Sequence, residues 1–350
     1  MNQQNLQPDM LDLLPQPAFY VQDGVITRVN QAATQKLLTP GTQVAAILQT
    51  GADEYSQFSG GSLHLTVTTE GTEAGATVTR IGDKDVFVLD QSGESEVFTA
   101  LSLAAQELRE PLSTIMTTSE RLFPAFKESA NDNLSRQLSQ FNQGLYKMLR
   151  LIGNMSYAGR YSKSGAYRQT CNIRMYFEEL TDTAELLIAK SGRTIVYHGL
   201  ETDLFCLVNQ EQLERAYYNL LSNAVKFSPE GAAIHVTLSR NGRKLFLTVE
   251  NPKDDYTGKD FFTSFLREPG INDGRCGLGL GMVLVRAVAR SHEGTVLVEQ
   301  TDSTAKVTMT LCINQKTTTA VRSPILRVDY AGERDHGLLE LSDALPPDAY

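Results

Sequence analysis

Two stretches between residues 96 and 160 carry side chains at the alternating four- and three-residue spacing of a heptad repeat. The first set is Leu101, Ala105, Leu108, Leu112, Ile115, Ser119 and Leu122, and the second is Leu134, Leu138, Phe141, Leu145, Met148, Ile152 and Met155. Pro124 and the polar run 128–133 interrupt the pattern between them, which predicts two helices folded back as an antiparallel hairpin. One hairpin leaves half of each seam uncovered, so we predict that two copies pack side by side as a four-helix bundle.

Residues 1–90 alternate short apolar runs with turn residues and predict a small mixed α/β domain. Asp23-Gly24 lies between two runs at 18–21 and 25–29, the usual signal of a β-hairpin, and further strands are predicted at 63–67, 76–81 and 85–89. The beginning of this region, with Gly24 and the Asn-Gln-Ala-Ala run at 30–33, resembles a PAS sensor domain. That resemblance implies an input module.

Residues 165–314 mix long helices with strands, which predicts an α/β sandwich with helices over one face of a sheet and makes the whole chain an α+β multidomain protein. Helices are predicted at 173–189, 210–227 and 282–291, and strands at 194–198, 233–238, 244–249, 295–299 and 306–311. The last segment, 315–350, is rich in Thr, Pro and Asp, and we predict a loosely attached tail.

Polar side chains on the predicted helix 210–227 fit a magnesium-triphosphate ligand. Asn219, Asn223 and Lys226 are spaced to project from one helix face. An amide oxygen is a hard ligand for Mg²⁺, and lysine neutralises phosphate oxygens. For an isolated Asn pair, capping or bridging of neighbouring backbone is the competing interpretation.

A glycine-rich run, 277–281, precedes the helix predicted at 282–291. Glycines before a helix let backbone N–H groups approach phosphates closely, and the helix N-terminus favours negative charge. A tight turn selected only for packing is the alternative.

In this order, residues 96–314 resemble a sensor histidine kinase: a dimerisation hairpin followed by the ATP-binding domain shared with gyrase-type ATPases. The resemblance implies ATP and Mg²⁺ as cofactors. It places Asn223 at the metal, Asn219 where ATPase relatives carry a catalytic Glu and where it could also reach the metal, and Lys226 at phosphate. Gly277, Leu278 and Gly279 match the later glycine box of the site.

The segment that matches the adenine-binding box departs from the family pattern. Asn251 stands at the position of the usual Asp, and both glycines of that box are missing. A charge-assisted hydrogen bond is about twice as strong as a neutral one, so this amide costs on the order of 1 kcal/mol, near fivefold in affinity. We therefore expect ATP binding to be weakened but not abolished.

The match to the phosphoacceptor box is also incomplete. Glu107, Arg109 and Pro111 are in place, but Gln106 stands where the reactive histidine belongs, one position off the heptad seam and facing solvent. A carboxamide nitrogen has a delocalised lone pair and is a poor nucleophile. Because no histidine falls between residues 93 and 192, the hairpin offers no substitute acceptor, and no catalytic residue is assigned there.

Composition narrows the possible partners and location. Acidic residues exceed basic ones by 41 − 32 = 9 without a Lys/Arg run, which argues against nucleic acid. No apolar stretch reaches the roughly eighteen to twenty residues of a spanning helix, and the N-terminus lacks a signal-peptide core, so we expect a cytoplasmic protein. The four cysteines are far apart, which favours buried free thiols.

These patterns lead to one main hypothesis and two alternatives. The main hypothesis is a regulatory histidine-kinase-like protein of two-component signalling that binds, or once bound, Mg-ATP. It would act as a homodimer, as a heterodimer with an active histidine kinase, or through a response regulator. The alternatives are an active ATPase or a kinase that phosphorylates a partner in trans, and an interaction module that has lost ATP altogether.

Overall fold

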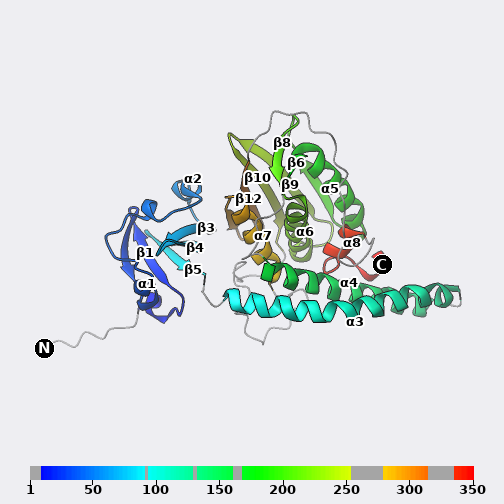
Figure 1. The fold of residues 1–350 in the computed structure, drawn as a ribbon. Helices are drawn as coiled ribbons and strands as arrows, with labels where there is room; N and C mark the ends of the chain where they lie inside the picture. The colour runs from blue at the N-terminus through cyan, green and yellow to red at the C-terminus, as the bar shows by residue number, and fades with distance from the viewer. Residues whose placement is uncertain (1–8, 91–93, 129–131, 161–167, 254–278, 314–334) are drawn as a thin grey trace.

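The structure is a computed structural model and describes residues 9–90, 94–128, 132–160, 168–253, 279–313 and 335–350. Its N-terminal region is an antiparallel sheet in the order β2-β1-β5-β4-β3 (Figure 1). The strands are β1 (Ala18–Gln22), β2 (Val25–Val29), β3 (Ser62–Thr69), β4 (Thr72–Ile81) and β5 (Lys84–Leu89). Short helices accompany them: η1 (Met10–Leu13), α1 (Gln31–Gln35), η2 (Val44–Ala46) and α2 (Ala52–Ser56). The predicted turn between β1 and β2 is present, because Asp23 and Gly24 both adopt positive φ, 51° and 75°.

The C-terminal region is a second sheet with helices packed on one face. Its strand order is β11-β12-β10-β9-β7, formed by β7 (Thr194–His198), β9 (Ala233–Asn241), β10 (Lys244–Pro252), β11 (Val296–Gln300) and β12 (Thr304–Cys312). Figure 1 shows α5 (Ile173–Ile188), α6 (Gln210–Phe227) and α7 (Leu280–Ser291) in front of this sheet. Side chains of β10 are alternately buried and half-buried, which gives the sheet one face in the helix-covered core. A turn of 3-10 helix, η3 (Ala189–Ser191), follows α5, and a separate pair of strands, β6 (Gln169–Asn172) and β8 (Phe205–Val208), was not predicted.

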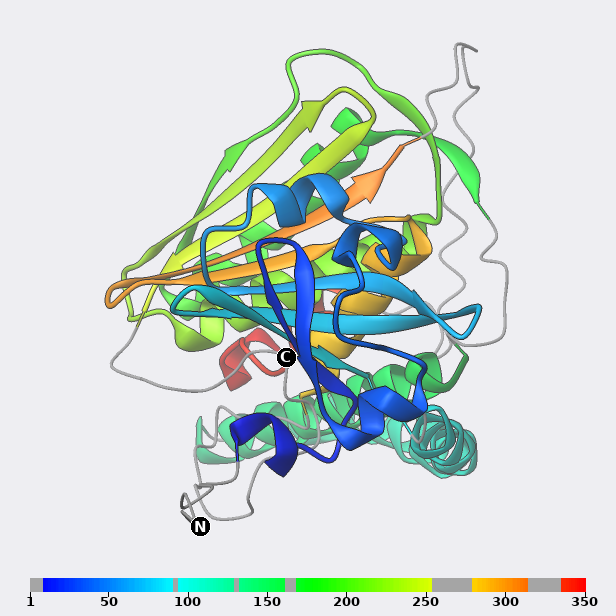
Figure 2. The ribbon, with the colours of Figure 1, turned by 90° about the vertical axis from the view of Figure 1, so that its left-hand side faces the viewer.

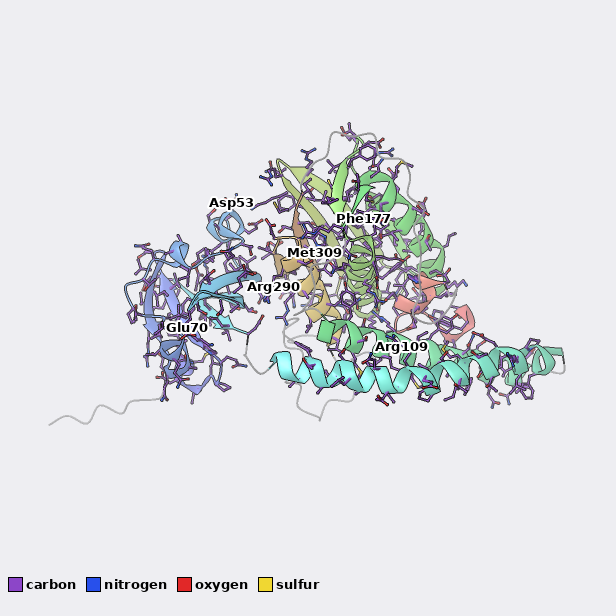
Figure 3. All side chains as sticks on the ribbon, viewed as in Figure 1. Asp53, Glu70, Arg109, Phe177, Arg290 and Met309 are labelled. Carbon is purple, nitrogen blue, oxygen red and sulfur yellow. The ribbon has the colours of Figure 1, made fainter. Side chains whose placement is uncertain are left out.

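The two regions share one continuous ten-stranded sheet, whereas the sequence predicted two separate ones. The joint is antiparallel pairing of β3 with β11, in which His64 lies opposite Val296. Gly61 makes this approach possible: a Cβ there would lie 2.2 Å from the Val298 carbonyl oxygen. Ion pairs flank the joint, from Lys244 to Asp53 and Glu54 at 2.9 Å and from Arg290 to Asp90 at 3.0 Å. Figure 2 looks at the molecule from the side of the N-terminal sheet, and Figure 3 labels Asp53 and Arg290 near the joint.

The predicted hairpin is formed by α3 (Glu94–Glu128) and α4 (Asp132–Arg160). Alternate seam positions pack between the two helices, including Ala105, Leu112, Leu145, Ile152 and Met155. Five other seam positions are 45–49% exposed: Leu108, Ile115, Leu122, Phe141 and Met148. The break predicted at Pro124 is wrong, because α3 continues through Pro111 and Pro124 to Glu128. Both prolines are exposed, so water can solvate the carbonyl groups that lose their helical partner.

The expectation of a loosely attached tail is wrong for residues 335–350. This segment forms α8 (His336–Glu340) and η4 (Pro347–Ala349), and Leu339, Leu341 and Leu345 are at most 3% exposed. It packs against α4, α5 and α6, as the red segment in Figure 1 shows. Burial of these leucines stabilises the folded segment, and the overall polar composition of the tail did not indicate it. Residues 315–334 lie outside the described residues.

The three cysteines in the described part of the chain are free, as the sequence predicted. Cys171, Cys206 and Cys312 are free thiols, the first two buried, and burial raises the pKa of Cys171 and of Cys206 to about 11. Cys276 lies outside the described residues. Within the described ranges, no helix has the length and apolarity to cross a membrane.

Candidate functional site

Helix α6 provides the framework of the candidate site. The Asn209 side chain caps its N-terminus by accepting a hydrogen bond from the backbone N–H of Gln212 at 2.9 Å. The buried side chains Leu213, Ala216, Tyr217, Leu220 and Leu221 fix this helix against the sheet. The predicted polar residues therefore have fixed positions: Asn219 is buried, while Asn223 and Lys226 are half-buried.

Asn219 lies where α6, α7 and α4 meet. Its Nδ2 donates to the Arg215 carbonyl one turn earlier at 2.7 Å, and its Oδ1 accepts from Arg150 Nη2 at 3.0 Å. A Cβ on Gly281 would lie 2.7 Å from Asn219 Oδ1, so the first turn of α7 can approach this side chain only with glycine at that position. The structure thus brings together two motifs that are about sixty residues apart in sequence.

The described part of the glycine run ends in the N-cap of α7. Gly279 is that N-cap, with φ 75°, a conformation that favours glycine. The helix begins at Leu280, so its first backbone N–H groups point toward this junction. Gly277 and Leu278 lie outside the described residues.

Lys226, predicted to contact phosphate, contacts a carboxylate of the C-terminal segment. Its Nζ donates to Asp343 Oδ2 at 2.8 Å. Burial lowers the pKa of Lys226, and the negative charge of Asp343 only partly offsets that effect. Burial alone would raise the pKa of Asp343, but Arg150 and Lys226 outweigh it and hold the pKa below its usual range. The carboxylate is therefore charged at neutral pH.

Arg150 of α4 connects the hairpin to α6 and to the C-terminal segment. Its side chain is only 5% exposed and donates to Ser222 Oγ at 3.2 Å as well as to Asn219. It also pairs with Asp343 Oδ2 at 2.9 Å and with Glu340 Oε2 at 3.5 Å. Buried charges of this kind are stable only with several partners.

Sequence reasoning missed Arg150, Glu340 and Asp343. An arginine beside a heptad seam is usually solvated, so no signal pointed to Arg150. The tail carried a usable signal, because Leu338, Leu341 and Leu345 follow a three- and four-residue spacing.

Asn251, the residue at the predicted adenine position, is the last residue but one of the central strand β10. It is 6% exposed, and its Nδ2 donates to the Pro252 carbonyl at 2.9 Å. One of the two N–H groups of the amide is thereby used by the local backbone, while the other N–H and the amide oxygen could still bind a ligand.

The residues of the predicted acceptor box lie on α3. Gln106 is exposed, as predicted from its place off the seam, and Glu107 and Pro111 are also exposed. Arg109, labelled in Figure 3, donates from Nη2 to Ser156 Oγ of α4 at 3.4 Å. A surface pocket follows this helix, lined by Gln106, Arg109, Glu110, Ser113, Thr114, Thr117, Thr118 and Arg121.

Among the described residues, no group of three or more His, Cys, Asp or Glu side chains could hold a metal ion. The residues predicted at this site offer amide oxygens to a magnesium ion, and a bound nucleotide would add phosphate oxygens. Asn219 Oδ1 already accepts from Arg150, whereas the half-buried Asn223 makes no hydrogen bond within the described part of the chain. Asn223 therefore fits a metal ligand in this arrangement, whereas the positive charge of Arg150 on Asn219 Oδ1 disfavours a cation there.

Comparison with known proteins agrees with this geometry. Residues 208–317 match the family described as Histidine kinase-, DNA gyrase B-, and HSP90-like ATPase. The chain is 26% identical over 203 residues to the Probable sensor protein PcoS of Escherichia coli, covering 56% of this chain and 42% of that protein. It is 24% identical over 201 residues to the Sensor histidine kinase WalK of Bacillus subtilis, covering 55% and 32%.

Among solved structures, full-length ShkA in complex with AMPPNP is similar at 17% identity and a TM-score of 0.49, covering 62% of this chain and 46% of that one. The chain spans less than half the length of the curated relatives named here. The α6–α7 junction lies within the matched residues. Residues 208–317 thus match a histidine-kinase-like ATPase domain, and the chain is similar to part of two proteins named as sensors, one of them a sensor histidine kinase.

Proposed function

We propose that this chain is a regulatory histidine-kinase-like protein that binds Mg-ATP weakly and cannot phosphorylate itself on its hairpin. The observation that carries the proposal is Gln106, an exposed carboxamide at the acceptor position of α3. A phosphoryl group cannot be transferred to it at a useful rate, because the amide nitrogen is not nucleophilic. Signalling then proceeds through conformation or through a partner.

Nucleotide binding is assigned to the junction of α6 and α7. Asn223 would hold magnesium, Lys226 the phosphates and Asn251 the adenine. Support comes from the proximity of Asn219 to Gly281 and from the match to an ATPase family. Magnesium would supply charge neutralisation of the phosphates when bound.

We assign dimerisation to the exposed half of the heptad seams. Leu108, Ile115 and Leu122 form an apolar stripe along α3, and Phe141 and Met148 extend it on α4. A second hairpin, from this chain or from an active histidine kinase, would cover the stripe as a four-helix bundle. The pocket beside Gln106 is the surface we assign to a response regulator.

The N-terminal sheet is assigned to input as a PAS-like module. Support comes from the five antiparallel strands and from the short helices α1 and α2 between β2 and β3. Its pairing with β11 gives a signal at this module a direct route to the ATPase-type sheet.

Incubation of the full chain with labelled ATP and magnesium tests the proposal. We expect nucleotide binding by calorimetry and no acid-labile phosphoprotein. Detection of acid-labile phosphate on α3 or α4 refutes it.

The second candidate is an active ATPase or a kinase that acts on a partner in trans. It is favoured by the retained polar face of α6. Turnover of ATP that is lost in Asn223→Ala would establish this candidate, whereas the first one predicts no turnover in either protein. Absence of binding at millimolar nucleotide would leave an interaction module.

A further inference from the structure

The C-terminal segment 335–350 is built into the interior of the molecule. Besides its buried leucines, it contains Gly337, where a Cβ would lie 2.7 Å from Leu187 Cδ1 of α5. The hydroxyl group of Tyr350 donates a hydrogen bond to the Leu338 carbonyl at 2.7 Å and so joins the two ends of the segment. The segment is therefore a folded element with a specific seat.

One side of this seat is helix α4. Gln143 Nε2 donates to the Leu345 carbonyl at 2.6 Å, and Ser139 Oγ donates to the Tyr350 carbonyl at 3.2 Å. The rings of Tyr146 and Tyr350 lie 5.0 Å apart between centroids. These contacts fix the segment to the hairpin without involving any residue assigned to the nucleotide.

The other side of the seat is the polar face of α6. A single oxygen, Asp343 Oδ2, accepts a hydrogen bond from Lys226 Nζ at 2.8 Å and forms an ion pair with Arg150 Nη1 at 2.9 Å. Glu340 pairs with Arg215 at 3.4 Å and with Arg150 at 3.5 Å. An anionic oxygen held between the buried Arg150 and the half-buried Lys226 has the charge expected of a phosphate oxygen.

We propose that residues 335–350 act as an intramolecular ligand of the nucleotide site, with the Asp343 carboxylate on Lys226 in place of a phosphate oxygen and Arg150 held on Asn219. This inference rests on the proposed nucleotide site and names its regulation. A triphosphate reaches Lys226 only when Asp343 leaves, so the seated segment lowers nucleotide affinity. Since the segment also binds α4, its departure removes the contacts that it makes between the hairpin and α6.

The linkage has a definite sign. When the competent state is only partly populated, the apparent Kd rises in inverse proportion to that population. Variants that unseat the segment must therefore tighten nucleotide binding, and nucleotide must in turn unseat the segment.

The test uses the full chain and two substitutions that unseat the segment by different means. Asp343→Asn removes the negative charge that pairs with Lys226. We expect this variant to bind Mg-ATP about tenfold more tightly, which corresponds to about 1.4 kcal/mol. Gln143→Ala removes the hydrogen bonds to the Leu345 and Ser342 carbonyls, leaves the charges of Asp343 and Lys226 in place, and is also expected to tighten binding. Asp348→Asn, at an exposed position of the same segment, is the matched control and leaves the Kd unchanged.

Calorimetry with Mg-ATP gives the Kd, and hydrogen–deuterium exchange of residues 335–350 reports seating. We expect faster exchange in both test variants, and also in the wild-type chain when Mg-ATP is added. Tightening in Asp343→Asn but not in Gln143→Ala, although exchange rises in both, would mean that only local charge changed and would overturn the proposal.

Two further outcomes separate this proposal from the assignment of the site. If the wild-type chain binds Mg-ATP while the segment stays fully protected, the nucleotide site stands and the intramolecular ligand does not. If no protein binds nucleotide even when exchange shows the segment unseated, the nucleotide site itself falls and the proposal falls with it.

Discussion

The imidazole of His64 is expected to make the joint between the two sheets sensitive to acid. His64 lies on β3 opposite Val296 of β11 and is 3% exposed. Burial lowers its pKa to about 3, the positive charges of Arg286 and Arg290 add to that effect, and Asp90 opposes it. The side chain is therefore neutral in the folded chain over the physiological range.

The sign and size of the effect follow from linkage. The unfolded imidazole binds a proton below a pKa of about 6.5, whereas the folded one does so only near 3, so stability is lost as the pH falls between these values. At pH 5 the difference of about 1.5 units corresponds to about 2 kcal/mol. His292, which burial holds at a pKa of about 4, adds a second contribution of the same sign.

The assay is thermal unfolding of wild type, His64→Gln and His235→Gln at pH 7, 6 and 5. We expect His64→Gln to lose about 2 kcal/mol less than wild type between pH 7 and 5, which is roughly 3 °C less loss in Tm for a chain of 350 residues. His235 is exposed, so His235→Gln should match wild type in this difference. An unchanged pH dependence in His64→Gln refutes the reasoning, whatever the stability at pH 7.

Three further predictions concern the hairpin. Ile115→Glu places a charge on the exposed half of the seam and should convert a dimer to a monomer in analytical ultracentrifugation. The control Leu186→Glu, at an exposed site on α5, should leave the dimer intact. A dimer that survives Ile115→Glu argues against the bundle. Leu149→Ala should cost about 2–5 kcal/mol in unfolding free energy because Leu149 is 2% exposed, and a loss below about 1 kcal/mol would contradict its packing. Gln106→His should acquire acid-labile phosphate from ATP, since it supplies an exposed imidazole beside Glu107; a variant that binds ATP without labelling would place the defect outside position 106.

Much of the fold could be predicted because its elements carry periodic patterns. Helix α6 begins and ends where apolar spacing predicted, and Asn219, Asn223 and Lys226 follow from its geometry. The Asp23-Gly24 turn likewise depends only on local chemistry.

The features that sequence reasoning missed depend on contacts between distant segments. An edge strand presents unpaired backbone N–H and C=O groups that any other strand can bind. The sequence near β3 therefore does not indicate that β11 is its partner, apart from Gly61, which permits the close approach. The role of Arg150 arises from Asp343, which is 193 positions away in a segment whose composition suggested disorder. A few leucines at helical spacing in a polar segment predict an ordered helix only when the surface that buries them is known.

The central claim is that a nucleotide site has been retained on a chain whose hairpin cannot accept a phosphoryl group. The most direct measurement is a single preparation of the full chain tested for Mg-ATP binding and, with labelled ATP, for acid-labile phosphate mapped by proteolysis. The account predicts saturable binding and no label within residues 94–160. Label recovered from that segment would contradict it.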